Sequence, residues 1–243
     1  MLYLRPSAVD HPHRGSHYSF LPPLPALRSR LVAAGALAVA FVAFAMAIAA
    51  GMLDSLDKQV LQGMEGLWSE PLHPLFQAIA ELGGLELTTI LMIGLVVYLL
   101  RAGFGSDAWV VLVFIAATVL ELLYKANLHH VGPPQTVAHA DGPSITELVS
   151  GSGGLANSFP SGHVVRAVIA YGLLAFVIQR LAPWPRARML AIPVATVLIL
   201  LEAFDRLYLD VHWESDVVGG LLLGAIGMLA GTIWLDRPRT PDN

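Results

Sequence analysis

The chain has 243 residues, of which 56% are hydrophobic and only 13% are charged. This composition is too apolar for an ordinary soluble domain of this length and indicates a membrane protein. The net charge of -4 gives no overall basic surface, so we expect no nucleic-acid partner. The chain has no cysteine, which excludes disulfides, thiolate zinc sites and a cysteine nucleophile.

Six mostly apolar segments are long enough to cross the roughly 30 Å hydrocarbon core of a bilayer as helices. They lie at residues 31–53, 85–100, 109–128, 163–181, 190–207 and 215–235. The expected fold class is therefore all-α, a six-transmembrane-helix bundle in one domain over residues 31–235. Pro193 would fall in the first turn of the fifth helix, where its missing N–H costs little. Small residues within 33–51 and 219–231 would let neighbouring helices approach closely.

Basic residues predict the orientation of the bundle, because short loops rich in Lys and Arg stay on the cytoplasmic side. Ten of the 14 basic residues fall on one side: Arg5, Arg14, Arg28, Arg30, Arg101, Arg180, Arg186, Arg188, Arg237 and Arg239. Residues 1–30 and 236–243 are therefore expected to be cytoplasmic tails, with no cleaved signal peptide at the start. The outer loops would be residues 54–84 and 129–160. The first of them is either an amphipathic hairpin on the outer interface or an ordinary loop with one helix.

Ionisable side chains near membrane depth are costly, so their default interpretation is functional. Such residues gather at the extracytoplasmic ends of four predicted helices: Lys125, Ser161, His163, Arg166, Arg206, His212 and Asp216. Each alone has an ordinary explanation, since terminal Lys and Arg extend to the headgroups and a Ser-Gly pair often only caps a helix. Their presence together at one level favours a functional site.

The residue types in this set suit phosphate chemistry. Lys125 and Arg206 offer fixed positive charge to phosphate oxygens. Ser161 and Gly162 precede a helix, where free N–H groups and the positive end of the helix dipole favour an anion. Asp216 lies four residues after His212, so on one helical face it could hold one imidazole nitrogen as N–H and leave the other free to attack. His163 could protonate a departing alkoxide.

These residues resemble the three-motif signature of the type 2 phosphatidic acid phosphatase family, which includes bacterial undecaprenyl-pyrophosphate phosphatases and soluble vanadium haloperoxidases. The second motif, P-S-G-H, is intact at residues 160–163. The third, S-R followed by five residues, H, three residues and D, ends at His212 and Asp216, with Asp205 replacing the Ser. In the first, K followed by six residues and R-P, Lys125 is present but Gly132 stands where Arg is expected. The resemblance covers roughly residues 85–235.

The resemblance implies a role for each residue of the set. His212 would be the nucleophile that forms a phosphohistidine, Asp216 would orient it, and His163 would protonate the leaving lipid oxygen. Lys125, Arg206, Ser161 and the backbone N–H groups of Gly162 and His163 would hold the phosphoryl oxygens. The family needs no metal, and no acidic metal-binding cluster is visible in the sequence, so we expect no metal and no cofactor.

Because Gly132 stands where the first motif has an arginine, two alternatives for phosphate binding are open. In the first, Arg166 replaces the missing arginine, because it lies three residues after His163 on nearly the same helical face. In the second, the site is weakened or specialised, and His129 or His130 is a softer phosphate donor. Arg166 could instead form only a structural ion pair with Glu121 or Glu202.

Two glutamates precede the expected phosphate-binding cations by one helical turn. Glu121 lies four residues before Lys125, and Glu202 lies four residues before Arg206. This is the favourable order for helical ion pairs. We therefore expect these acids to hold the cations in place, or otherwise only to stabilise their helices.

The expected function is metal-independent hydrolysis of a lipid phosphate or pyrophosphate, isoprenoid or glycerolipid, at the extracytoplasmic face of a bacterial cytoplasmic membrane. A non-catalytic lipid-phosphate binding or transport protein of the same fold is the alternative. A haloperoxidase using vanadate is disfavoured, because those relatives are soluble. Membrane lipids and the lipid substrate are the expected partners.

Overall fold

The structure is a computed structural model that describes residues 24–134 and 157–237. Within these residues six helical stretches are long and apolar enough to cross a membrane, which confirms the predicted all-α, six-span fold. Most of both predicted tails and most of the predicted outer loop at residues 129–160 lie outside the described residues.

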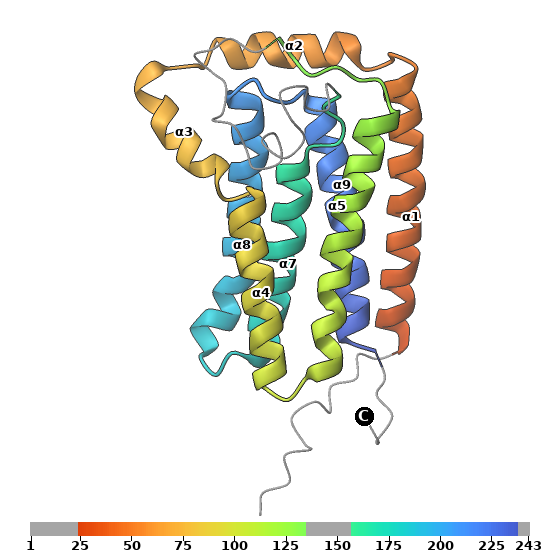
Figure 1. The fold of residues 1–243 in the computed structure, drawn as a ribbon, viewed down its shortest axis with the longest axis vertical. Helices are drawn as coiled ribbons and strands as arrows, with labels where there is room; N and C mark the ends of the chain where they lie inside the picture. Colours follow the sequence, from red (N-terminus) through yellow and green to blue (C-terminus); the bar gives the residue numbers. More distant parts are fainter. Residues whose placement is uncertain (1–23, 135–156, 238–243) are drawn as a thin grey trace, which may run out of the picture.

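The spanning helices run side by side, and a shorter helix lies across one end of the bundle (Figure 1). The long helices are α1 (Leu24–Ala49), α4 (Leu85–Arg101), α5 (Val111–Asn127), α7 (Gly162–Leu181), α8 (Pro185–Tyr208) and α9 (Glu214–Leu235). The transverse helix is α2 (Asp54–Glu65); η1 (Glu70–Leu72) and α3 (His73–Ala80) lead from it to α4, and η2 (Gly105–Val110) leads into α5. The beginning of α1 and the end of α9 lie at the end of the bundle opposite α2 (Figure 1).

Helix α7 is the centre of the bundle and packs against α4, α5, α8 and α9. Its close approach to α9 depends on glycine, because a Cβ placed on Gly224 would lie only 2.6 Å from the Cβ of Val168. The expectation of close packing by small residues in 219–231 is therefore confirmed. It does not extend to Gly35 of α1, which has no neighbouring atom within 4 Å at this position.

Helix α1 begins and ends earlier than the predicted 31–53 span. It starts at Leu24, so it already includes Arg28 and Arg30. It ends at Ala49, because Gly51 adopts a φ of +70°. This left-handed conformation is accessible to glycine, and it lets the N–H of Met52 donate to the carbonyl of Ala47 at 3.0 Å, closing the helix end.

Helix α8 also begins before its predicted first residue, and this corrects the expected place of Pro193. The helix starts at Pro185, whose fixed φ suits a first helical position. Pro193 is therefore inside the helix and not in its first turn. Because proline has no N–H, the carbonyl of Met189 loses its usual helical partner at this point.

The segment 54–84 contains two helices and one short 3₁₀ turn, more than an ordinary loop with one helix. Asp57 and Met64 of α2 are buried, whereas all its other residues are exposed or half-buried. The ring of Phe76 in α3 stacks on Tyr208 at the end of α8, with centroids 3.8 Å apart. The Tyr208 hydroxyl accepts the N–H of Ser69 at 2.8 Å. The segment thus packs onto the bundle through α2 and α3, and its position on a membrane interface stays a prediction.

At the opposite end of the bundle, the carboxylate of Asp236, directly after α9, connects three helices. Arg30 of α1 and Arg180 of α7 each approach it to 2.6 Å. Both guanidinium groups also lie over the ring of Phe176, at 5.7 and 4.6 Å from its centroid. Asp236 thereby connects the beginning of α1 with the ends of α7 and α9.

Candidate active site

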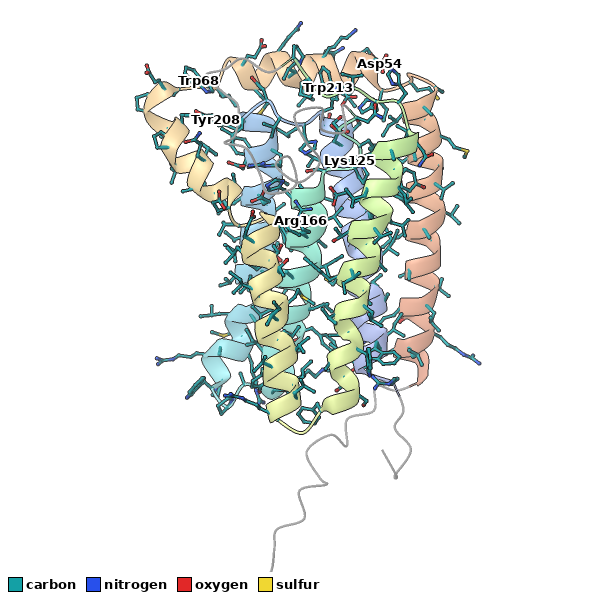
Figure 2. All side chains as sticks on the ribbon, viewed as in Figure 1. Asp54, Trp68, Lys125, Arg166, Tyr208 and Trp213 are labelled. Atoms are coloured by element: carbon teal, nitrogen blue, oxygen red, sulfur yellow. The ribbon has the colours of Figure 1, made fainter. Side chains whose placement is uncertain are left out.

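The predicted site residues converge at the end of the bundle covered by α2. Lys125 lies in the last turn of α5, Ser161 caps α7, Arg206 lies in the last turn of α8, and Asp216 lies in the first turn of α9. Figure 2 shows Lys125 and Arg166 in the half of the bundle that adjoins α2. Helices that are distant in sequence therefore bring their polar ends to one level.

The imidazole of His212 is paired with the carboxylate of Asp216, as the spacing predicts. His212 Nδ1 lies 3.2 Å from Asp216 Oδ2. The same oxygen accepts the N–H of Trp213 at 2.9 Å, which fixes the carboxylate at the start of α9. Because a carboxylate can only accept, Nδ1 carries the proton and Nε2 is left with a free lone pair. Helix α9 begins at Glu214, so His212 precedes the helix and does not share a helical face with Asp216.

Burial favours the neutral form of His212. Removal from water is the largest cause that lowers its pKa, and the charges of Lys125 and Arg206 lower it further. The hydrogen bond and negative charge of Asp216 oppose this effect, but the pKa stays below its usual value of 6.5. Near neutral pH the imidazole is therefore unprotonated, which is the form that can act as a nucleophile.

The P-S-G-H segment forms the start of α7 and contains an unused hydroxyl. Ser161 is fully buried, and its Oγ has no hydrogen-bond partner within the described parts of the chain. Its backbone N–H donates to the carbonyl of Asp216 at 3.0 Å, which joins the segment to the first turn of α9. A buried hydroxyl without a partner costs free energy unless a ligand satisfies it. Ser161 therefore fits a binding role.

Gly162 packs directly against the carboxylate of Glu121. A Cβ at this position would overlap the Glu121 side chain, so no larger residue fits without moving it. The Glu121 carboxylate in turn accepts from Lys125 Nζ at 2.9 Å and from Arg166 Nη1 at 3.1 Å. One buried acid thus holds two cations beneath the start of α7.

Arg166 occupies the ion pair that was considered as its structural alternative. Besides Glu121 Oε2, its Nε donates to the carbonyl of Gly83 at 3.2 Å, and the side chain is buried. The expected pair between Arg206 and Glu202 is also present, with 3.3 Å between Nε and Oε1. Arg206 additionally binds Asp205, the residue that replaces the motif serine. The phosphate-binding roles of Arg166 and Arg206 stay predictions.

His129 and His130, which lie within the first motif, have different surroundings. His129 is exposed and lines an open groove of about 520 Å³ beside α5. His130 is half-buried, and its Nε2 lies 3.3 Å from Ser215 Oγ and 3.5 Å from Asp216 Oδ1. Gly132 faces Ser158, whose Cβ would be 3.4 Å from a Cβ on the glycine. Their predicted role as softer phosphate donors is not tested by these contacts.

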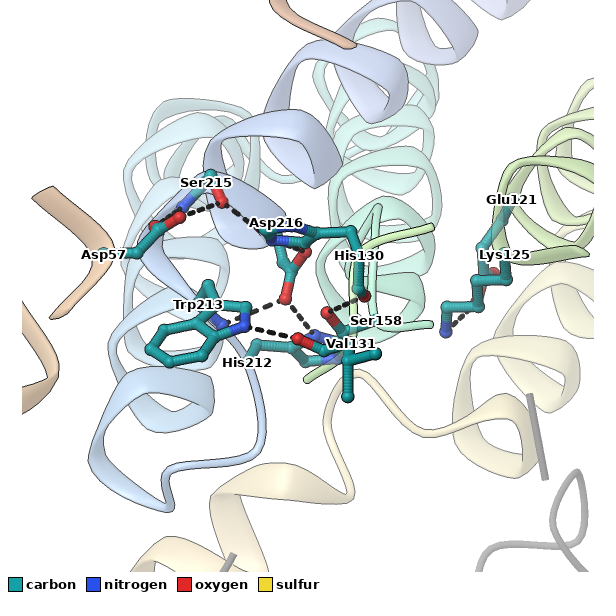
Figure 3. Close-up of polar contacts among 10 residues, drawn as sticks. All are labelled: Asp57, Glu121, Lys125, His130, Val131, Ser158, His212, Trp213, Ser215 and Asp216. Carbon is teal, nitrogen blue, oxygen red and sulfur yellow. Dashed lines mark hydrogen bonds and ion pairs between the residues drawn. The ribbon is translucent and has the colours of Figure 1, made fainter. Parts of the chain in front are cut away.

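Several residues at the site were not singled out from the sequence. Asn157, three residues before the P-S-G-H segment, contacts the first motif twice, because its amide donates to the carbonyl of Lys125 at 2.8 Å and accepts the N–H of His130 at 3.1 Å. Asp57 of α2 accepts from Ser215 through both carboxylate oxygens. Figure 3 shows Asp57, Ser215, His130, Asp216 and His212 as one connected polar group. In the sequence Asp57 is one of several acids in the predicted outer loop at residues 54–84.

No group of three or more His, Asp or Glu side chains in residues 24–134 and 157–237 is arranged to hold a metal ion. Two acids of the site lie beside cations: Glu121 contacts Lys125 and Arg166, and Glu202 contacts Arg206. The arrangement is suited to an anion that is bound by cations and N–H groups.

Comparisons with known proteins agree with these motifs. Over 70 residues the chain is 34% identical to phosphatidylglycerophosphatase B of Bacillus subtilis, covering 28% of this chain and 34% of that protein. It is 40% identical over 77 residues to a putative undecaprenyl-diphosphatase, YbjG, of Escherichia coli, covering 32% of this chain and 34% of the relative. It is 29% identical over 160 residues to the bacitracin transport permease protein BcrC of Bacillus licheniformis, and this match covers 65% of this chain and 69% of that protein. The matches to the two phosphatases thus span only about a third of their lengths.

A solved structure has the same fold. It is the crystal structure described as the first transmembrane PAP2 type phosphatidylglycerolphosphate phosphatase from Bacillus subtilis, with a TM-score of 0.66 and 23% identity. The match covers 82% of this chain and 94% of that chain. A family model described as the PAP2 superfamily matches residues 107–239, which include Lys125, the P-S-G-H segment, Arg206, His212 and Asp216. The chain therefore belongs to the PAP2 superfamily.

Proposed function

We propose that this protein is a membrane enzyme that hydrolyses a lipid phosphate or pyrophosphate through a phosphohistidine intermediate at the extracytoplasmic face. The observation that supports it best is the buried His212–Asp216 pair, 3.2 Å apart, beside Ser161, whose hydroxyl has no hydrogen-bond partner among the described residues. Membership of the PAP2 superfamily and similarity to relatives named as lipid phosphatases support the same activity.

The first half of the reaction transfers the phosphoryl group to the enzyme. Nε2 of His212 attacks phosphorus, a P–N bond forms, and the P–O bond to the lipid breaks. His163 gives a proton to the departing oxygen, so that the lipid leaves as a neutral alcohol or, from a pyrophosphate, as a protonated phosphate. Asp216 stabilises the positive charge that develops on the imidazole.

The second half returns the histidine to its starting state. A water molecule attacks phosphorus while His163, now unprotonated, accepts its proton, and the P–N bond breaks to release inorganic phosphate. In both halves Lys125, Arg206, Ser161 and the free N–H groups at the start of α7 would bind the phosphoryl oxygens. No step uses a metal ion.

A groove beside the site offers space for the lipid chain. It lies between the outer ends of α1 and α5 and is lined mainly by apolar side chains, with Leu120, Leu123, Tyr124 and Leu128 on the α5 side. These residues lie on either side of Lys125 in the sequence. A lipid whose chain occupied this groove would carry its phosphate toward the end of α5.

The proposal is tested with the full chain purified in detergent. The protein is offered phosphatidate, phosphatidylglycerol phosphate, undecaprenyl phosphate and undecaprenyl pyrophosphate with excess chelator, and released phosphate is measured. We expect release that chelator does not reduce, together with an acid-labile, base-stable phosphoenzyme at short times. The order of rates identifies the substrate. Binding without release would instead indicate a lipid-phosphate binding or transport protein, and loss of release with chelator would contradict the metal-free mechanism.

Arg166 is expected to contribute to phosphate binding as the replacement for the arginine missing at Gly132. Arg166→Lys keeps the charge but loses the planar fork, so we expect turnover to fall about tenfold or more. The exposed Arg186 provides a control, because Arg186→Lys should leave turnover unchanged. Near-normal turnover in Arg166→Lys would contradict a phosphate-binding role and would leave Arg166 with a structural role only, through its ion pair to Glu121.

A further inference from the structure

Asp216 has a second imidazole neighbour that the reaction described above does not use. His130, from the segment after α5, places Nε2 3.5 Å from Asp216 Oδ1, while His212 occupies Oδ2. Asp216 is fully buried, and its Oδ1 accepts no hydrogen bond from the described residues. One catalytic carboxylate thus faces a histidine on each of its two oxygens (Figure 3).

The contacts of Ser215 determine which way His130 points its proton. The Ser215 hydroxyl lies 2.8 Å from Asp57 Oδ2, and its backbone N–H donates to Asp57 Oδ1 at 2.9 Å. An ionised Asp57 can only accept, so the single hydroxyl proton of Ser215 is directed to it. Ser215 Oγ then has only lone pairs for His130 Nε2, at 3.3 Å. His130 Nε2 must therefore carry a proton, and the same N–H faces Asp216.

Other contacts hold His130 in this place. Its backbone N–H donates to the side chain of Asn157 at 3.1 Å, and its carbonyl accepts the N–H of Ser158 at 2.8 Å. Asp57 comes from α2, is only 3% exposed, and has its pKa raised chiefly by burial. A buried acid in contact with the first turn of α9 is costly unless its hydrogen bonds compensate for desolvation.

We propose that His130, directed by Ser215 and Asp57, is a positioning residue that shares the Asp216 carboxylate with the nucleophile His212. The N–H of His130 faces Oδ1 at 3.5 Å, and its partial positive charge favours this rotation of the carboxylate and draws negative charge away from Oδ2. His212 is then held in the correct orientation but is less strongly stabilised as an imidazolium. The nucleophile stays unprotonated to lower pH than it would with Asp216 alone. This inference rests on the proposed hydrolysis.

The pH profile separates this role from simple support of the fold. The charged and titratable groups that face His212 are Lys125 and Glu121 of α5, His163 of α7, Arg206 of α8, Asp216 of α9 and His130 through Asp216. Removing the His130 donor leaves all the others in place and returns negative charge to Oδ2. The pKa of His212 then rises, so the fall in activity on acidification begins at higher pH.

The experiment compares His130→Ala, His130→Gln, Asp57→Asn and wild type in the full detergent-solubilised protein, with kcat and KM measured for a lipid phosphate from pH 4 to 9. For His130→Ala we expect kcat to fall about tenfold or more with little change in KM. The acidic limb should move to higher pH. His130→Gln keeps an N–H donor and should recover most of kcat and the wild-type limb. Asp57→Asn should resemble His130→Ala, because an amide can donate to Ser215 and reverse the hydrogen-bond direction.

Two matched controls are available on neighbouring elements. Asp54→Asn changes an exposed acid in the same first turn of α2, and His73→Ala removes a histidine at the start of α3; neither should move the profile. An acidic limb that is unmoved or moves to lower pH in His130→Ala would overturn the inference. If wild type releases no phosphate, the proposed function fails, and the His212 pKa is read instead by NMR of ring-labelled histidine in the same variants. An unchanged His212 pKa in His130→Ala would then reject the inference separately.

Discussion

Replacing His212 with alanine is expected to reduce phosphate release by at least about a thousandfold, because this change removes the nucleophile itself. The reason is geometric: the N–H of Trp213 holds the Asp216 carboxylate, the carboxylate binds Nδ1 of His212, and Nε2 is the nitrogen left to attack. Rates are measured with the preferred lipid phosphate under single-turnover conditions. The same variant should form no phosphoenzyme, and bound lipid phosphate should remain intact.

The role of His163 can be distinguished from that of His212 by changing the leaving group. A general acid matters most when the departing oxygen is basic. His163→Ala should therefore lose much more activity on an alkyl phosphate than on a p-nitrophenyl phosphate. His212→Ala should lose its activity on both substrates. Equal losses on the two substrates in His163→Ala would contradict its assignment as the proton donor, and residual phosphoenzyme in His212→Ala would contradict the nucleophile.

Replacing Gly162 with alanine is expected to damage both the fold and the reaction. The added methyl group would overlap the Glu121 carboxylate, which must then move away from Lys125 and Arg166. We expect a loss of about 1–3 kcal/mol of stability, as in other overpacked interiors. Turnover should fall by about a hundredfold, because displaced cations no longer meet the phosphoryl oxygens.

This prediction is measured by thermal unfolding in detergent and by turnover at saturating substrate. Gly35→Ala is the matched control, because it adds the same methyl group to a membrane helix at a position with no atom within 4 Å. That variant should be as stable and as active as wild type. If Gly162→Ala had wild-type stability and turnover, the position of the Glu121 carboxylate beneath the start of α7 would matter for neither the fold nor the reaction.

The sequence predicted those parts of the molecule that depend on local pattern. Apolar length identified six spans, and the spacing between His212 and Asp216 predicted their pairing. Helix ends were less accurate, because α1 and α8 extend through the polar zone where hydropathy no longer distinguishes helix from loop. Pro193 was assigned to a helix start for this reason, although Pro185 holds that position.

Contacts between distant segments could not be predicted in the same way. Nothing near Asp57 indicates that it will meet Ser215, because the two are separated by 158 positions. The pairing of Glu121 with Lys125 follows from helical spacing, but its second bond to Arg166 requires the packing of α5 against α7. Buried polar residues on unrelated helices find partners only when the tertiary structure brings them together.

The attachment of α1 has a consequence for how the protein is made. Of the six described spans α1 is synthesised first, yet it packs mainly on α9, which is synthesised last of the six, and Arg30 pairs with Asp236 directly after α9. During synthesis α1 can therefore contact Tyr124 of α5 through Phe41 early, but most of its packing surface is covered only after α9 is inserted. Its composition suits this delay, since it is the most apolar of the six spans. The contacts between α1 and α9 form only after the last of these six described spans is inserted.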